Sequence, residues 1–168
     1  MNSSLRFKRG FTLVEVLVYL AIFVTVTTAA TYLLISLNDV VDRYRVNTLL
    51  YRSGSAALEH MVVEMRQANQ FNAGGSVTNT AATGALSVVN TSTTTTFTKS
   101  GDGLLLSINS VSYGNIVDDN LEVDGFTVYQ YNTAAGTLVR LKLELTATVG
   151  SSTKSMTLYG GSVIRGDL

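Results

Sequence analysis

Residues 8–17 of the chain read Lys-Arg-Gly-Phe-Thr-Leu-Val-Glu-Val-Leu, a basic pair and a glycine followed by the beginning of a long apolar segment. From Phe11 to Leu37 there are 27 residues, and apart from tyrosine only Glu15 has an ionisable side chain. A helix of this length reaches roughly 40 Å, which is enough to cross a bilayer. The segment therefore predicts a membrane-spanning helix with one carboxylate near its start.

The carboxylate of Glu15 is the exceptional feature of this segment. Placing a carboxylate in hydrocarbon costs roughly 2 to 4 kcal/mol or more, depending on its depth. One interpretation is that Glu15 reaches back to the lipid headgroups, as polar side chains near the ends of membrane helices do. The other is that a dedicated partner compensates its charge.

Together, Lys8, Arg9, Gly10, Phe11 and Glu15 resemble the class III signal of type IV pilins and pseudopilins. The resemblance implies that prepilin peptidase recognises the basic leader at Lys8 and Arg9 and cuts after Gly10. It also implies that the new terminal residue, Phe11, is N-methylated. Glu15 then occupies the fifth position of the mature chain, where the family carries a glutamate that pairs with the terminal amine of a neighbouring subunit. Glu15 is therefore expected to act in assembly.

The same resemblance implies partners and a location. The partners are prepilin peptidase, other pilin or pseudopilin subunits, an inner-membrane assembly platform and membrane lipid. Arg6, Lys8 and Arg9 precede the span, whereas Asp39 and Asp42 follow it, and this bias favours a cytoplasmic N-terminus. We expect a single-pass protein of the inner or cytoplasmic membrane, with an extracytoplasmic C-terminal domain, that moves into a pilus or pseudopilus.

Downstream of Leu37 the chain becomes polar while a helical period continues. Apolar residues recur mostly at steps of three and four, which predicts a helix with one buried face. They are Val46, Leu49, Leu50, Ala57, Leu58, Met61, Val62 and Met65. The helix is predicted to run to about Asn69, and Gly54 is expected to weaken it locally.

The remainder of the chain has the composition of β-structure. Residues 72–84 have the composition of a connector. Gly101-Asp102-Gly103 and Ala134-Ala135-Gly136 are expected to close hairpins. Runs rich in Thr, Val, Leu and Tyr predict strands at 85–89, 93–98, 104–108, 111–117, 121–131, 137–149 and 155–165.

The predicted fold class is α+β, with a long N-terminal helix, first transmembrane and then amphipathic, packed on an antiparallel β-sheet. The chain divides into four expected segments. They are a cleaved leader at 1–10, a transmembrane and assembly helix at 11–37, an amphipathic continuation of that helix at 38–70, and a β-rich extracytoplasmic domain at 71–168.

The strand predicted at 137–149 has the clearest alternation, with Val139, Leu141, Leu143 and Leu145 on one side and charged residues between them. Together with the last predicted strand, the segment 138–146 looks like the C-terminal half of J-type pseudopilins and the related W-type minor pilins. This resemblance implies a place in a tip complex. The chain has no cysteine and no proline, which favours a minor pilin or pseudopilin over a major pilin.

The densest run of oxygen ligands comprises Asp118, Asp119, Asn120, Glu122 and Asp124. Calcium prefers hard oxygen ligands of this kind, so one interpretation is a calcium site. The spacing does not match an EF-hand loop, and the other interpretation is a solvated acidic turn beside a strand.

The composition argues against several other functions. The formal net charge is zero, and residues 71–168 hold five cations against seven anions, so the sequence has no clear nucleic-acid site. His60 is the only histidine and there is no cysteine, which excludes a zinc cluster and a Cys/His pair. His60 is expected to be a partly exposed residue of the amphipathic helix. We expect no enzymatic activity and no cofactor other than the possible calcium ion.

Two threonine-rich stretches have more than one interpretation. Thr25, Thr27, Thr28 and Thr31 are expected to bond back to carbonyls of their own helix, and the alternative is that they let the helix loosen in a filament. The run Thr91–Thr98 is expected to form a polar edge strand, and the alternatives are contact with a substrate or attachment of glycan.

The sequence is compatible with two rival functions. The span can tether a signal-anchored binding domain, or ordinary signal peptidase can cut near Ala29-Ala30 and release a secreted one. Neither rival explains Glu15. The sequence also leaves open whether the machine is a type II secretion system, a type IV pilus or a competence apparatus.

Overall fold

A computed structural model describes residues 12–133 and 136–164. The predictions for Lys8, Arg9, Gly10 and Phe11, and the turn at Ala134-Ala135, lie outside these residues. The contacts divide the chain into two compact units, one up to Val41 and one from Asp42 onward. The helix α1, Leu13–Gln67, contributes to both units, and each unit is described by itself.

In the first unit, α1 carries its apolar side chains on the outside, and the four threonine hydroxyls are turned inward to the backbone. Thr27, Thr28 and Thr31 each donate to the carbonyl oxygen four residues earlier, at 2.8, 2.8 and 2.9 Å. Thr25 Oγ1 donates to the Ile22 carbonyl at 2.8 Å. These bonds confirm the prediction and satisfy hydroxyls that apolar surroundings leave without water partners.

In the second unit, α1 buries one stripe of side chains. The buried positions follow steps of four, four, three, four and four residues, as one face of a helix requires. They are Val46, Leu50, Gly54, Ala57, Met61 and Met65. Leu49, Leu58 and Val62 are partly buried beside them. The predicted amphipathic helix is therefore confirmed, and it ends at Gln67 rather than at about Asn69.

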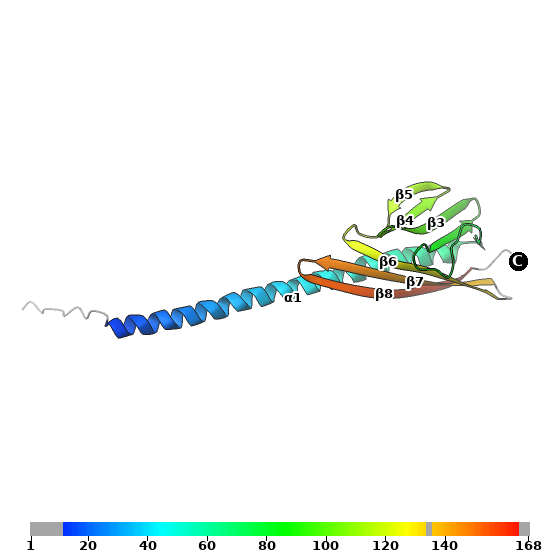
Figure 1. Ribbon diagram of the computed structural model, residues 1–168. Helices are drawn as coiled ribbons and strands as arrows, with labels where there is room; N and C mark the ends of the chain where they lie inside the picture. Colours follow the sequence, from blue (N-terminus) through cyan, green and yellow to red (C-terminus); the bar gives the residue numbers. More distant parts are fainter. Residues whose placement is uncertain (1–11, 134–135, 165–168) are drawn as a thin grey trace, which may run out of the picture. The chain divides into compact units, whose positions relative to one another are not determined.

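The strands form two antiparallel sheets (Figure 1). The five-stranded sheet has the order β1 (Gln70–Phe71), β2 (Ala85–Asn90), β3 (Thr93–Ser100), β4 (Gly103–Ile108) and β5 (Val111–Asn115). The three-stranded sheet has the order β6 (Leu121–Thr133), β7 (Gly136–Val149) and β8 (Ser152–Ile164). The α+β class is confirmed, and the expected single sheet is replaced by two.

The run Thr91–Thr98 is not an edge strand, and that prediction was wrong. Thr91 belongs to a turn, and β3 pairs with β2 on one side and with β4 on the other. Three consecutive hairpins produce this central position, because each strand folds back on the one before it. The polar composition of β3 reflects one partly exposed face, since Thr95 and Phe97 on its other face are buried.

The three-stranded sheet lies along the second half of α1 (Figure 1). A Cβ at Gly54 would approach the Cδ1 atoms of Leu145 on β7 and Leu158 on β8 to 2.6 and 2.7 Å. Glycine at this position therefore lets the helix contact the sheet closely. The helix continues through Gly54 without a break. The expected local weakening stays a prediction, and the structure adds a packing role for this glycine.

The connector between β1 and β2 covers the outer edge of β6. Asn79 N donates to the Val128 carbonyl at 2.9 Å, and Phe126 N donates to the Ala81 carbonyl at 3.0 Å. A side chain at Gly84 would overlap the carbonyl oxygen of Phe126. The connector thus joins the two sheets through backbone contacts, and the common core contains residues of α1 and of both sheets.

Candidate functional site

Thr12 caps the start of α1. Its Oγ1 accepts a hydrogen bond from Glu15 N at 3.3 Å, and its carbonyl oxygen accepts one from Val16 N at 3.2 Å. A threonine followed three residues later by glutamate is the spacing of a capping box. This spacing is visible in the sequence, although the cap was not among the predictions. It places Glu15 in the first helical turn, where the helix dipole favours a negative charge.

The carboxylate of Glu15 faces along the helix toward Tyr19. The Tyr19 hydroxyl donates to Glu15 Oε1 at 3.3 Å, across one helical turn. A neutral phenol supplies a hydrogen bond but leaves the negative charge in place. The ion pairs in the described part of the chain join His60 to Glu64 and Lys142 to Glu144, and neither includes Glu15. Tyr19 therefore orients the Glu15 carboxylate without neutralising its charge.

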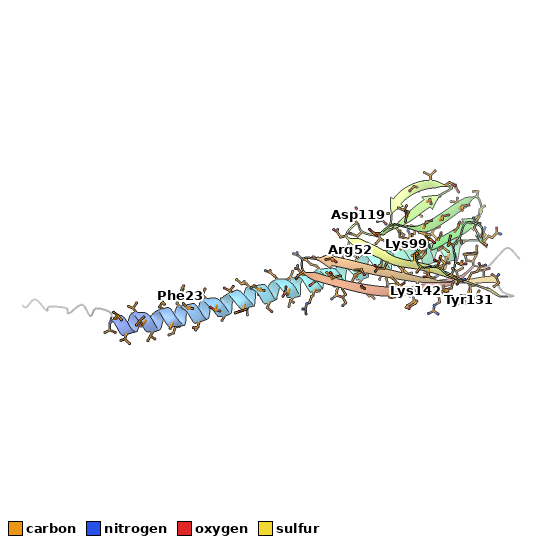
Figure 2. The ribbon with its side chains drawn as sticks, in the orientation of Figure 1. Phe23, Arg52, Lys99, Asp119, Tyr131 and Lys142 are labelled. Atoms are coloured by element: carbon orange, nitrogen blue, oxygen red, sulfur yellow. The ribbon has the colours of Figure 1, made fainter. Side chains whose placement is uncertain are left out.

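The helix around Glu15 exposes a long apolar surface. Phe23 points away from the helix axis and is 70% exposed (Figure 2). The described residues contain one helix long and apolar enough to cross a membrane, with a mean hydropathy of 2.1 in its most apolar window and none of that window buried. An uncovered apolar surface of this length requires lipid or other helices around it.

The acidic residues after β5 have separate contacts. Asp118 Oδ1 accepts hydrogen bonds from the backbone N–H and the side-chain amide of Asn120, at 2.9 and 2.8 Å. These bonds favour the ionised carboxylate and hold the pKa of Asp118 below its usual value, the backbone bond contributing most. Asp118 N in turn donates to Ser53 Oγ on α1 at 3.0 Å.

The other candidate calcium ligands lie nearby without forming one cluster. Asp124 accepts a hydrogen bond from Thr146 Oγ1 at 2.6 Å. Asp119 and Glu122 line a shallow hollow together with Asp102, which the sequence run did not include. Among residues 12–133 and 136–164, no three His, Cys, Asp or Glu side chains are grouped as a metal ion requires. Calcium binding stays a prediction.

His60 lies on the wet side of the amphipathic helix, as expected. Its side chain is 44% exposed, and its Nε2 is 3.9 Å from Glu64 Oε1. Its ring meets the buried ring of Phe97 edge-on, with 5.5 Å between the centroids. His60 therefore lies at the border of the core, with its ring against Phe97 and its side chain partly exposed to solvent.

The geometry defines a class of protein: one long N-terminal helix whose first part is apolar and uncovered, and whose second part belongs to an antiparallel β domain. Within that class, the family model of the prokaryotic N-terminal methylation motif matches residues 5–31. The chain therefore carries the signature of type IV prepilins and pseudopilins. No curated protein and no solved structure matches the chain.

The motif has consequences for processing and role. It implies cleavage by prepilin peptidase and assembly with other pilins. Proteins that carry it are structural subunits rather than enzymes. The apolar helix and the motif together fit a membrane-anchored pilin-like protein.

Proposed function

We propose that this protein is a minor pilin or pseudopilin that is cleaved after Gly10, N-methylated on Phe11, and assembled through α1 into a type IV pilus or a type II secretion pseudopilus. The methylation motif at residues 5–31 supports this proposal. The observation that carries it is Glu15, a carboxylate in the first turn of α1, where the first part of the helix is otherwise apolar and uncovered.

The proposed mechanism is assembly controlled by charge pairing. Cleavage creates a cationic amine on Phe11, and methylation keeps its charge. Glu15 of an incoming subunit pairs with the Phe11 amine of a neighbour, which aligns the two helices. An unpaired charge in an apolar bundle costs several kcal/mol, so the pair selects the register even where its net contribution to stability is small. The bond from Tyr19 orients the carboxylate before the partner arrives.

The proposed topology follows from the charges around the span. The leader with Lys8 and Arg9 lies in the cytoplasm, residues 11–37 cross the membrane, and residues 38–70 continue the helix into an extracytoplasmic domain at 71–168. An inner-membrane assembly platform and the surrounding lipid are further proposed partners. A J-like or W-like place at the tip belongs to the same proposal.

The N-terminus of the mature protein tests this proposal. Mass spectrometry is applied to the protein from cells with and without prepilin peptidase. We expect a mature chain beginning at N-methylated Phe11, and its loss without the enzyme. An intact Met1 end in both strains favours a membrane-tethered binding domain instead, and a start near Thr31 favours a secreted domain; either result contradicts the proposal.

A further inference from the structure

A basic hollow lies where the turn between β7 and β8 meets the start of the second unit. It has a volume of about 410 Å³, and its lining includes Arg43 and Asn47 of α1 and Ser152, Thr153 and Lys154 of the hairpin. Arg43 and Lys154 are separated by more than a hundred residues in sequence, and the fold brings both to one small concavity. No acidic residue is among those that line it.

The two cations of the hollow, Arg43 and Lys154, differ in how they are held. Lys154 Nζ donates to Asn47 Oδ1 at 2.6 Å, which fixes the ammonium against the helix. Arg43 is exposed, and no ion pair of the described residues includes it. A guanidinium presents a planar fork of donors that matches the oxygens of a phosphate group, and a lysine ammonium adds a point charge. The side chains of Ser152 and Thr153 add hydroxyl groups to the same wall.

Chain connectivity keeps this hollow close to the membrane. Arg43 follows Leu37, the last residue of the apolar segment, by six positions. Six residues span at most about 20 Å even when fully extended. The layer of lipid phosphates lies directly beyond the hydrocarbon core, so a helix that crosses the bilayer up to Leu37 places Arg43 within reach of it.

The charges around the hollow nearly cancel, so long-range electrostatic attraction is not the main force that would hold an anion there. Asp39 and Asp42 offset Arg43 and Arg45, and Lys154 leaves a net surplus of one positive charge. The Asp42 carboxylate lies against Gly150 in the turn, next to the hollow. A ligand must therefore be held by contacts inside the hollow rather than by the general field of the surface.

We infer that this hollow binds the phosphate group of an anionic phospholipid and holds the β7–β8 turn at the membrane surface while the subunit waits for assembly. The inference rests on the membrane anchorage in the proposed function, but not on cleavage or assembly. It adds a lipid contact in the extracytoplasmic domain, separate from the lipid that surrounds the helix.

The test uses the full chain in nanodiscs of phosphatidylcholine, with and without phosphatidylglycerol. Hydrogen exchange of residues 149–155 is measured by mass spectrometry at constant ionic strength. We expect the anionic lipid to slow exchange in this turn several-fold, because a phosphate group bound between Arg43 and Lys154 holds the turn against the helix. The double variant Arg43→Gln/Lys154→Gln should lose this response, and Arg43→Lys/Lys154→Arg should keep most of it.

A matched control removes two cations that do not line the hollow, in Arg52→Gln/Lys99→Gln (both labelled in Figure 2), and should respond like the parent protein. Inorganic phosphate added to phosphatidylcholine nanodiscs distinguishes the two sources of a phosphate group. Equal protection by inorganic phosphate, or an unchanged lipid response in Arg43→Gln/Lys154→Gln, would overturn the inference. Failure of peptidase-dependent cleavage would instead contradict the proposed function and leave the lipid response unchanged.

Discussion

At the residue scale, the proposed function gives the Glu15 side chain a role in assembly, and its main chain has a separate role in the helix cap. Its backbone N–H belongs to the cap formed by Thr12, and its carboxylate faces Tyr19. Only the carboxylate can pair with a neighbour's amine, because the cap uses the main chain. Substituting the side chain therefore separates assembly from helix formation.

Glu15→Val should leave membrane insertion and cleavage intact and reduce assembled filaments at least tenfold, because the incoming helix loses the carboxylate that pairs with the neighbour's Phe11 amine. Immunoblots of precursor, mature subunit and sheared filaments measure the three steps. Tyr19→Phe is the matched control, since it removes the phenol but keeps the carboxylate, and it should reduce assembly less. Normal assembly of Glu15→Val would contradict the pairing.

The lowered pKa of Asp118 predicts that part of the protein's stability depends on pH. Its pKa is lowered by the backbone N–H and then by the side-chain amide of Asn120. A lowered pKa in the folded state contributes stability above the unfolded-state value, and this contribution is lost as the pH falls through the folded-state value. Asn120→Ala removes only the amide, so the pKa of Asp118 should rise part of the way toward its ordinary value.

NMR titration of the Asp118 carboxyl carbon measures that shift directly. Thermal unfolding should show that Asn120→Ala is destabilising at neutral pH and that the difference shrinks in acid. In an Asp118→Asn background the effect of Asn120→Ala should no longer depend on pH. A pH-dependent effect that persists in that background would assign the titration to another group.

Gly84 and Gly74 form a matched pair within one connector. A methyl group at Gly84 would overlap the Phe126 carbonyl. This carbonyl belongs to the backbone of β6, so it cannot rotate out of the way as a side chain can. At Gly74 the nearest atom to such a methyl is Asn72 Oδ1 at 3.6 Å, an ordinary contact. Gly84→Ala should cost about 1 to 3 kcal/mol or more, and Gly74→Ala should stay within about 0.5 kcal/mol.

Thermal unfolding of the detergent-solubilised protein, followed by near-ultraviolet circular dichroism, compares these two variants. Equal melting temperatures would show that the connector does not have to approach β6 closely. A specific loss in Gly84→Ala would show that the backbone contact between the two sheets is part of the core.

At the element scale, the sequence could predict the helix, strands and turns that depend on a local pattern of residues. The period of apolar residues in α1 and the alternation of Val139, Leu141 and Leu143 in β7 each result from burial of one face, and the structure confirms both. The hairpin at Gly101 is confirmed as well, with Gly101 at a φ of 57° and Ser100 paired with Gly103. Such features involve residues that are neighbours along the chain.

The elements that sequence could not predict depend on distant contacts. β1 has only two residues, Gln70 and Phe71, and exists because β2 pairs with it. The central place of β3 and the division into two sheets follow from which strands meet after folding. At the candidate site, the spacing of Thr12 and Glu15 could have revealed the cap, whereas only the fold joins Lys154 to Arg43.

At the scale of the whole molecule, the core belongs to the second unit alone. Among residues 12–133 and 136–164, the buried apolar residues run from Val46 to Ile164, and none lies before Val41. A chain comprising residues 42–168 should therefore fold without the span and remain soluble without detergent. Its new first residue, Asp42, also places a carboxylate at the start of the shortened helix, where the dipole favours it.

Size-exclusion chromatography without detergent and thermal unfolding by circular dichroism check this expectation. We expect a monodisperse species with one cooperative transition. The full chain serves as the comparison and should require detergent, because its apolar helix is uncovered. Aggregation of residues 42–168, or unfolding without a cooperative transition, would show that the first unit contributes to the stability of the second.

The three-stranded sheet has two edge strands, β6 and β8. The connector between β1 and β2 covers the outer edge of β6. β8 runs over Ser152–Ile164, ends the strand order, and has Lys154 as its only charged residue. An edge strand with a single charged residue and no proline is a template for main-chain pairing with an extended polypeptide. The domain comprising residues 42–168 is therefore expected to stay monodisperse in dilute solution, whereas long storage at high concentration should favour association of two molecules through β8.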